Sequence, residues 1–120
     1  MLLPNSVIHI GKYAFAHNYK ALKSVNLPSS LKSIDEYAFW NCNLFTSVTI
    51  PKSVSFIGKG AFGACYGLRE VHSKIENPFP IEPKTFDNPS EGIRLYVPRG
   101  TRQKYLNTKG WNSIYEIIEE

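Results

Sequence analysis

Residues 27–49 read LPSSLKSIDEYAFWNCNLFTSVT, and residues 50–72 read IPKSVSFIGKGAFGACYGLREVH. Both segments are 23 residues long, and AFWNC at 38–42 in the first recurs as AFGAC at 61–65 in the second. Self-similarity at a fixed period of this length is the sequence mark of a repeat architecture. The repeat therefore decides the fold of this chain and the meaning of most of its residues.

Two further copies flank this pair. The segment that starts at Leu3, LPNSVIHIGKYAFAHNYKALKSVN, follows the same plan with one extra residue near Asn18. On the other side, PIEPKTF at 80–86 repeats the plan of FIGKGAF in the preceding copy, with Thr85 in the Ala position. We therefore predict three full repeats of 23–24 residues and one degenerate repeat within residues 1–98.

The apolar residues of successive copies fall into aligned columns, which can be buried only if the copies stack on one another as a solenoid. Segments 22–27 and 45–50 share the pattern apolar-x-x-apolar-x-apolar, which ends in the alternation of a strand. One strand per turn predicts a parallel sheet with about 4.8 Å between neighbouring strands. Pro28, Pro51 and Pro98 should end the strands, because proline cannot donate to the ladder.

The repeats resemble the BspA-like (Treponema pallidum type) leucine-rich repeats of bacterial surface proteins. The shared pattern is roughly LPxSVxxIGxxAFxxCxxLxxVxI, and the resemblance covers about residues 3–98. It implies an α/β repeat fold, a right-handed leucine-rich-repeat solenoid with a short-strand parallel sheet. It also implies a cell-surface or secreted protein that recognises a host or neighbouring-cell protein in adhesion. The residues themselves contain no localisation signal that would indicate this.

Residues 99–120 are expected to close the last turn, and they resemble the C-terminal cap of Bacteroides-type proteins of this kind. Thr101 is a candidate N-cap and Gly110 a candidate helix stop. Trp111 should belong to the core of the cap, and EIIEE at 116–120 should be a solvated tail. No equivalent cap precedes the first repeat, so its open edge predicts self-association or a missing N-terminal segment.

Cys42 and Cys65 share a column, so we expect them on adjacent turns, about 4.8 Å apart. That distance does not exclude a disulfide. Stacked side chains point the same way, however, and a repeat position filled by Cys is usually a small buried apolar residue. We expect both thiols to be free and buried, with a disulfide or a metal pair as the alternatives.

The candidate ligand-binding surface is the outward face of the strand sheet. It should carry two exposed rows: Ser24, Ser47, Glu70 and Arg94 in one, and Asn26, Thr49, His72 and Tyr96 in the other. Arg and Tyr are enriched at interface hot spots, whereas ordinary solvated side chains are the alternative explanation. The candidate binding residues are Glu70, His72, Arg94, Tyr96, Asn26 and Thr49.

Several other classes of protein are disfavoured by composition and motifs. The net charge of +4 comes from scattered basic residues, which does not indicate nucleic-acid binding. No apolar run approaches the roughly 20 residues of a membrane span, so membrane insertion is not expected. The three histidines lie in different columns without a zinc spacing, and no hydrolase or P-loop signature is present. We expect no metal, no cofactor and no catalytic residue.

Two other functions stay open beside protein recognition. A glycan-binding module would use Trp40, Tyr19 and Tyr66 on the bends as stacking platforms, provided that their rings are exposed and coplanar. A structural spacer of a larger protein would need no binding surface at all. The sequence does not identify a ligand.

Overall fold

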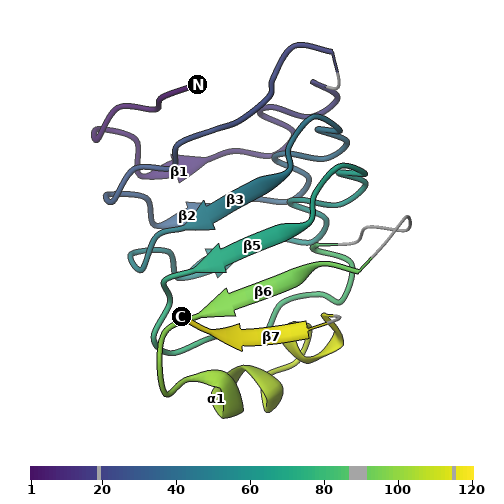
Figure 1. Ribbon diagram of the computed structural model, residues 1–120. Coiled ribbons are helices and arrows are strands. Elements are labelled where there is room, and N and C mark those ends of the chain that lie inside the picture. Colours follow the sequence, from purple (N-terminus) through teal and green to yellow (C-terminus); the bar gives the residue numbers. More distant parts are fainter. Residues whose placement is uncertain (19, 87–91, 115) are drawn as a thin grey trace.

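The structure is a computed structural model that describes residues 1–18, 20–86, 92–114 and 116–120. The chain winds as a parallel-strand solenoid of about five turns, in which the apolar columns of the repeat meet inside. The N-terminal turn lies at one end of the stack and the short helix of the C-terminal segment at the other (Figure 1). The repeat-based prediction of a parallel, stacked architecture is confirmed.

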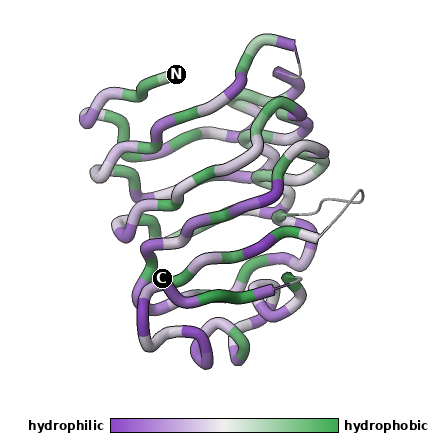
Figure 2. The backbone as a smooth tube through the Cα atoms, in the orientation of Figure 1, coloured by the Kyte–Doolittle hydropathy of each residue, from purple (hydrophilic) through white to green (hydrophobic). Residues whose placement is uncertain are grey.

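The larger sheet has four parallel strands in the order β3 (Ser47–Ile50), β5 (Glu70–Ser73), β6 (Arg94–Val97) and β7 (Glu116–Glu119). Alternate residues point inward, and one buried row crosses all four strands in register: Val48, Val71, Leu95 and Ile117. Hydropathy therefore alternates along β3, β5 and β6, whereas β7 carries two isoleucines in succession (Figure 2). Because successive side chains point to opposite faces of a strand, the repeat period also sets which residues face outward.

A second sheet lies on another wall of the solenoid, which is a correction to the single sheet that we predicted. It has three parallel two-residue strands in the order β1 (His9–Ile10), β2 (Ser33–Ile34) and β4 (Phe56–Ile57). The isoleucine of each strand is buried, and the residue before it faces outward or is half-buried. Two residues per strand are too few to produce the alternation by which the sequence pattern detects a strand.

The bends between the walls stack a ladder of phenylalanines. The rings of Phe15, Phe39, Phe62 and Phe86 are nearly parallel, with centroids 5.1–5.3 Å apart. The backbone N–H of each inner ring's residue donates to the next turn, as Phe39 does to the carbonyl of Ala61 (2.7 Å). Phe86 continues the ladder, so the degenerate fourth repeat stacks on the third as the full repeats stack on one another.

The first repeat departs from the plan. Residues 22–27 were predicted to form a strand, but only Asn26 is paired there, through an isolated parallel bridge to Leu2. Within residues 20–86, which the structure describes without a gap, segment 24–27 forms no backbone hydrogen bond with β3. The ladder is therefore interrupted between these two turns, although Val25 keeps its buried position in the core.

The C-terminal segment contains a five-residue helix, α1 (Arg102–Leu106), a short 3-10 turn, η1 (Trp111–Ser113), and β7. The helix ends at Leu106, before the predicted stop, and Gly110 (φ +89°) instead stands just before η1. Thr101 occupies the N-cap position, but its hydroxyl donates to the carbonyl of Pro98 (2.6 Å) and accepts no hydrogen bond from a backbone N–H of the helix.

The predicted solvated tail is wrong. Residues 116–119 form β7, which pairs along its whole length with β6. Ile117 faces inward, next to Leu95, so the sheet gains a buried position from this segment. The three glutamates among residues 116–120 led to the prediction of a solvated tail. Ile117 instead takes the buried position beside Leu95, and the segment pairs as a strand.

Candidate binding face

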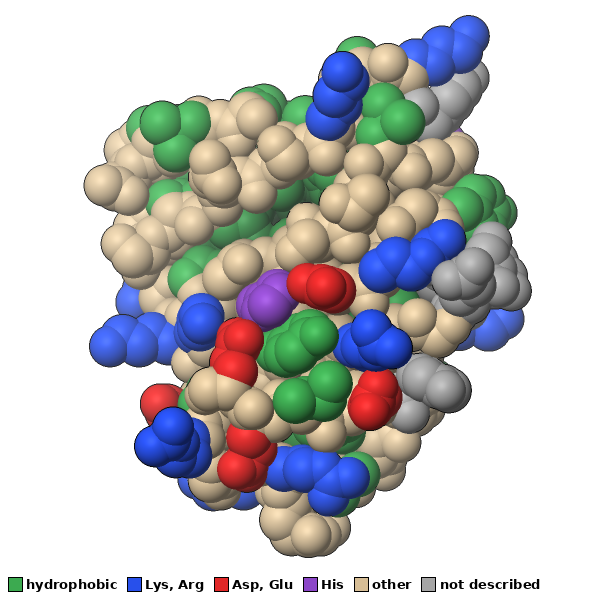
Figure 3. Space-filling model, viewed as in Figure 1, with side chains coloured by type: hydrophobic (Ala, Val, Ile, Leu, Met, Phe, Trp, Pro, Cys, Tyr) green, Lys and Arg blue, Asp and Glu red, His purple; other side chains and the backbone are tan. Residues whose placement is uncertain are grey.

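The outward residues of the larger sheet form a continuous surface, which we call the strand face. It consists of two rows in register: Ser47, Glu70, Arg94 and Glu116, and beside them Thr49, His72, Tyr96 and Ile118. Charged side chains gather over the part of this face next to α1, whereas the part nearer the N-terminus is mostly uncharged (Figure 3). The chemical variety of the surface is therefore concentrated on β5, β6 and β7.

His72 is the centre of this charged part. Its Nε2 atom lies 3.0 Å from Oε1 of Glu70, and its Nδ1 atom lies 3.0 Å from Oε1 of Glu120. Its ring stacks on the ring of Tyr96, with centroids 4.6 Å apart and an interplanar angle of 8°. The imidazole is thus fixed by contacts to its own strand, to β6 and to the residue that follows β7.

The electrostatics of the cluster follow from these contacts. Burial lowers the pKa of His72, but the hydrogen bonds with Glu120 and Glu70 outweigh it, so this pKa lies above its ordinary value. The hydrogen bond from His72 lowers the pKa of Glu120, and a bond from Lys74 at 3.4 Å adds to that effect. His72 and Glu120 therefore stabilise each other's charged forms.

A second ion pair crosses from β6 to β7. Nε of Arg94 lies 3.1 Å from Oε1 of Glu116, directly across the ladder. Both side chains are about half exposed, so the pair contributes little to stability, on the order of 0–1 kcal/mol. Its main effect is to orient the guanidinium along the surface.

The structure brings most, but not all, of the predicted binding residues together. Glu70, His72, Arg94 and Tyr96 lie together on the neighbouring strands β5 and β6. Thr49 lies beside His72 on β3, in register. Asn26 lies outside the sheet, on the turn that does not pair with β3, so it is not part of the strand face.

Sequence reasoning missed the residues that the C-terminal segment contributes, which are Glu116 and Ile118 on β7 and Glu120 just after it. They were assigned to a solvated tail, and their contacts to β5 and β6 span up to 48 residues of sequence. The sequence held no clear signal for this strand, because Ile117 and Ile118 are adjacent and the segment lacks the apolar–polar alternation of a half-buried strand.

A groove of about 860 Å³ borders the strand face, where the strands end. Its lining residues come from successive turns and include Leu27, Thr49, Pro51, Lys74, Pro98 and Glu120. A smaller hollow of about 400 Å³ opens between segment 24–27 and β3, where the ladder is interrupted. The strand face is therefore bounded by concave, partly apolar surface.

The cysteines carry no reactive chemistry in this arrangement. Cys42 and Cys65 are free and fully buried, and their thiols donate to the carbonyls of Phe15 and Phe39 at 3.2 Å. Burial raises the pKa of Cys42 to about 11 and that of Cys65 to about 12. Since the thiolate is the nucleophile and the metal ligand, thiols held in the neutral form serve as packing groups.

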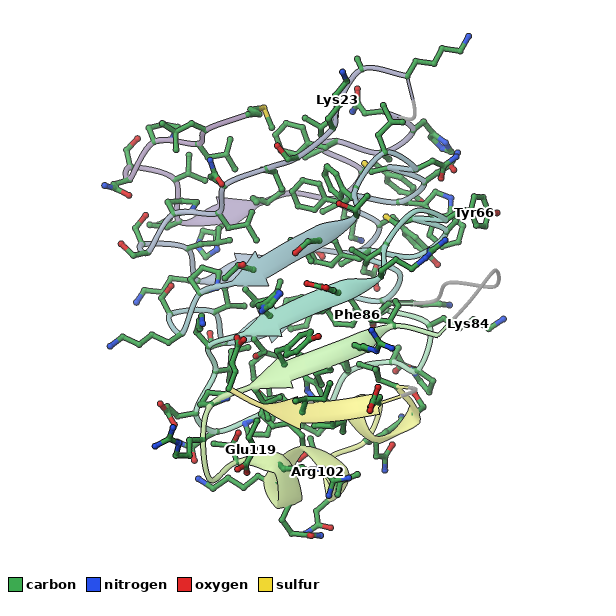
Figure 4. The ribbon with its side chains drawn as sticks, in the orientation of Figure 1. Lys23, Tyr66, Lys84, Phe86, Arg102 and Glu119 are labelled. Carbon is green, nitrogen blue, oxygen red and sulfur yellow. The ribbon has the colours of Figure 1, made fainter. Side chains whose placement is uncertain are left out.

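Trp40 and Tyr66, the two described residues among those proposed for glycan stacking, do not form a platform. Trp40 is half-buried, its ring meets Tyr37 edge-on at 5.5 Å, and it covers Gly63, where a Cβ would lie 2.4 Å from the indole. Tyr66 is exposed and points away from the body of the solenoid (Figure 4). Tyr19 lies outside the described residues. The condition of exposed, coplanar rings is not met by Trp40.

Two further features, a metal-binding cluster and a membrane-spanning helix, are not found in the described part of the chain. There, no three His, Cys, Asp or Glu side chains are arranged so that they could hold a metal ion. Likewise, none of the described helices is long and apolar enough to cross a membrane.

Comparison with known proteins identifies the repeat. The family model described as the BspA type leucine-rich repeat region (6 copies) matches residues 1–97, which is most of the chain. No curated protein matches the sequence.

Proposed function

Since the chain belongs to the BspA type leucine-rich repeat family, we propose that it is a protein-recognition module whose partner contacts the strand face. Repeat solenoids of this kind are scaffolds that present extended surfaces for binding. The observation that carries the proposal is the cluster of Glu70, His72, Arg94 and Tyr96, which the register of β5 and β6 brings together.

The composition of the cluster supports a protein partner. Arg94 and Tyr96 belong to the residue types that dominate interface hot spots, and both are oriented by neighbours before any partner binds. Such preorganisation reduces the side-chain entropy that is lost on association. The bordering groove supplies apolar surface beside these polar anchors.

We also propose the finer features of the fold that the resemblance implied. Right-handed winding is supported by the strong preference for that hand in parallel strand crossovers. A capping role for the C-terminal segment is supported by Tyr105 and Trp111, which are fully buried. The indole N–H of Trp111 donates to the carbonyl of Phe79 (2.7 Å), so this ring is anchored to the irregular segment that follows β5.

The setting of the recognition follows from the family, whose members are typically surface-exposed or secreted. We propose that this protein works at the cell surface, in adhesion to a host or neighbouring-cell protein. An enzymatic role would need a convergent polar pocket, and the groove beside the strand face is open and partly apolar.

Surface binding to a panel of extracellular-matrix proteins and glycans, at physiological salt, tests the proposal. The test variant carries Arg94→Ala and Tyr96→Ala. The matched control carries His9→Ala and Phe56→Ala on the second sheet, where both side chains are exposed. Thermal unfolding of each variant verifies that it is folded.

We expect saturable binding to one protein, weakened about tenfold or more in the strand-face variant and unchanged in the control. Equal loss in both variants would place the contact elsewhere. Binding to glycans alone would favour the glycan module, and silence across the panel by the folded chain would favour a structural spacer.

A further inference from the structure

The imidazole of His72 bridges two carboxylates that come from different parts of the sheet. Glu70 is two residues away on β5, whereas Glu120 follows β7, 48 residues further along the chain. The backbone N–H of Glu120 donates to the carbonyl of Val97 (3.0 Å), which places this residue beside the end of β6 (Figure 1). His72 therefore links the end of the chain to a strand that is not its direct neighbour.

Hydrogen-bond stoichiometry decides the protonation state of this bridge. An ionised carboxylate only accepts hydrogen bonds, and a neutral imidazole has only one N–H to donate. Contacts of 3.0 Å on both ring nitrogens can both be hydrogen bonds only if His72 is an imidazolium, with both nitrogens donating. A neutral His72 can keep Glu70 or Glu120, but not both.

No other described group around the His72 ring bridges the two carboxylates in place of the second ring N–H. On β6, Tyr96 stacks on the imidazole face, and the Arg94 side chain is held by Glu116. Just after β5, Nζ of Lys74 lies 3.4 Å from Oε1 of Glu120, the oxygen that His72 also contacts. The residue that lies opposite on β3, Thr49, is uncharged.

We propose that His72 is a pH-sensitive latch: when protonated it fastens Glu120 to Glu70 across the strand face, and when neutral it releases one of the two carboxylates. The change alters the charge and shape of the surface that a protein partner would contact. The claim that the latch regulates binding rests on the proposed function. The claim that His72 titrates as a bridge between the two carboxylates does not.

The direction of the pH dependence follows from the two shifts. The raised pKa of His72 means that its contribution to stability is present below its unfolded pKa and is lost as pH rises through its folded pKa. The lowered pKa of Glu120 means that its contribution is lost only as pH falls through its own folded pKa. The latch is closed in the window between these two folded-state values.

An NMR titration of the histidine side chains in the full chain tests the latch without any partner. We expect His72 to titrate above the ordinary histidine value and to shift downward in Glu120→Gln, which keeps the size of the side chain and removes its charge. The signals of His9 and His17 are internal references that this substitution should leave unchanged. A His72 midpoint at or below the ordinary value, or one that Glu120→Gln does not move, would overturn the latch.

The regulatory half is tested separately with whichever protein partner the binding panel yields. Affinity should differ between pH values on the two sides of the His72 midpoint, and the difference should shrink in Glu120→Gln. Equal affinity on both sides would overturn regulation. If no protein binds at any pH while His72 titrates as expected, the proposed function fails and the titrating bridge stands.

Discussion

Thr85 occupies a column of small residues that are packed against the core. Ala38, Ala61 and Thr85 all have no exposed surface, and the carbonyl of Thr85 accepts from the N–H of Phe62 (2.8 Å), as the repeat requires. The Thr85 hydroxyl, however, has no hydrogen-bond partner. A buried hydroxyl without a partner loses its bonds to water and gains none in exchange.

We expect Thr85→Val to raise the free energy of unfolding by about 1 kcal/mol, because it keeps the side-chain shape and removes the unpaired hydroxyl. Chemical denaturation measures the change. The matched control is Thr101→Val, which removes a buried hydroxyl that is bonded to Pro98 and should lower stability by about 1 kcal/mol. Effects of the same sign in both variants would contradict this explanation.

At the scale of elements, β7 is an edge strand that α1 covers. Nε of Arg102 donates to the carbonyl of Ile117 (3.0 Å), and the backbone N–H of Arg102 donates to Glu119 (3.0 Å). Figure 4 shows Arg102 and Glu119 next to each other at this end of the molecule. The guanidinium satisfies a carbonyl that would otherwise be free to pair with another chain.

Arg102→Ala should therefore expose the edge of β7 and increase concentration-dependent self-association, with a loss of about 1 kcal/mol in unfolding free energy. Light scattering after size-exclusion chromatography measures the association. Gln103→Ala is the control, because that side chain bonds to Asn107, at the end of its own helix. If both variants stay monomeric to the same concentration, Arg102 does not protect the edge.

At the scale of the whole molecule, each turn depends on the turns above and below it. Phe39 is fully buried, stacks on Phe15 and Phe62, and also contacts Phe45. Phe15 lies in the first repeat, is only partly buried and stacks on one ring. In a solenoid, the free energy of unfolding is close to a sum of terms for each turn and for each interface between turns. A residue in a central turn contributes to two interfaces, whereas a residue in a terminal turn contributes to one.

We expect Phe39→Ala to cost about 3–5 kcal/mol of unfolding free energy, and Phe15→Ala clearly less. Denaturant titration with far-UV circular dichroism measures both. If Phe39→Ala does not fold, Phe39→Leu should still fold and lose more stability than Phe15→Leu. Equal losses at the two positions would show that the stack does not share its stability between turns.

The sequence by itself determined the repeat, the stacking of its copies, the buried columns and the outward rows that became part of the strand face. These features depend on spacing alone, because a residue's place in the period decides whether it points inward or outward. The burial of Cys42 and Cys65 and the place of Phe86 in the ladder follow from the same rule.

Only the tertiary structure decided how the two ends of the chain are used. The glutamate-rich end pairs as β7 because β6 offers it a partner, whereas segment 24–27 lacks a ladder with β3 in spite of its strand pattern. The bridge from His72 to Glu120 joins residues that no repeat relates. Contacts of this kind depend on which segments meet in space. A periodic pattern predicts contacts between equivalent positions of successive repeats, but not contacts with residues outside the repeat.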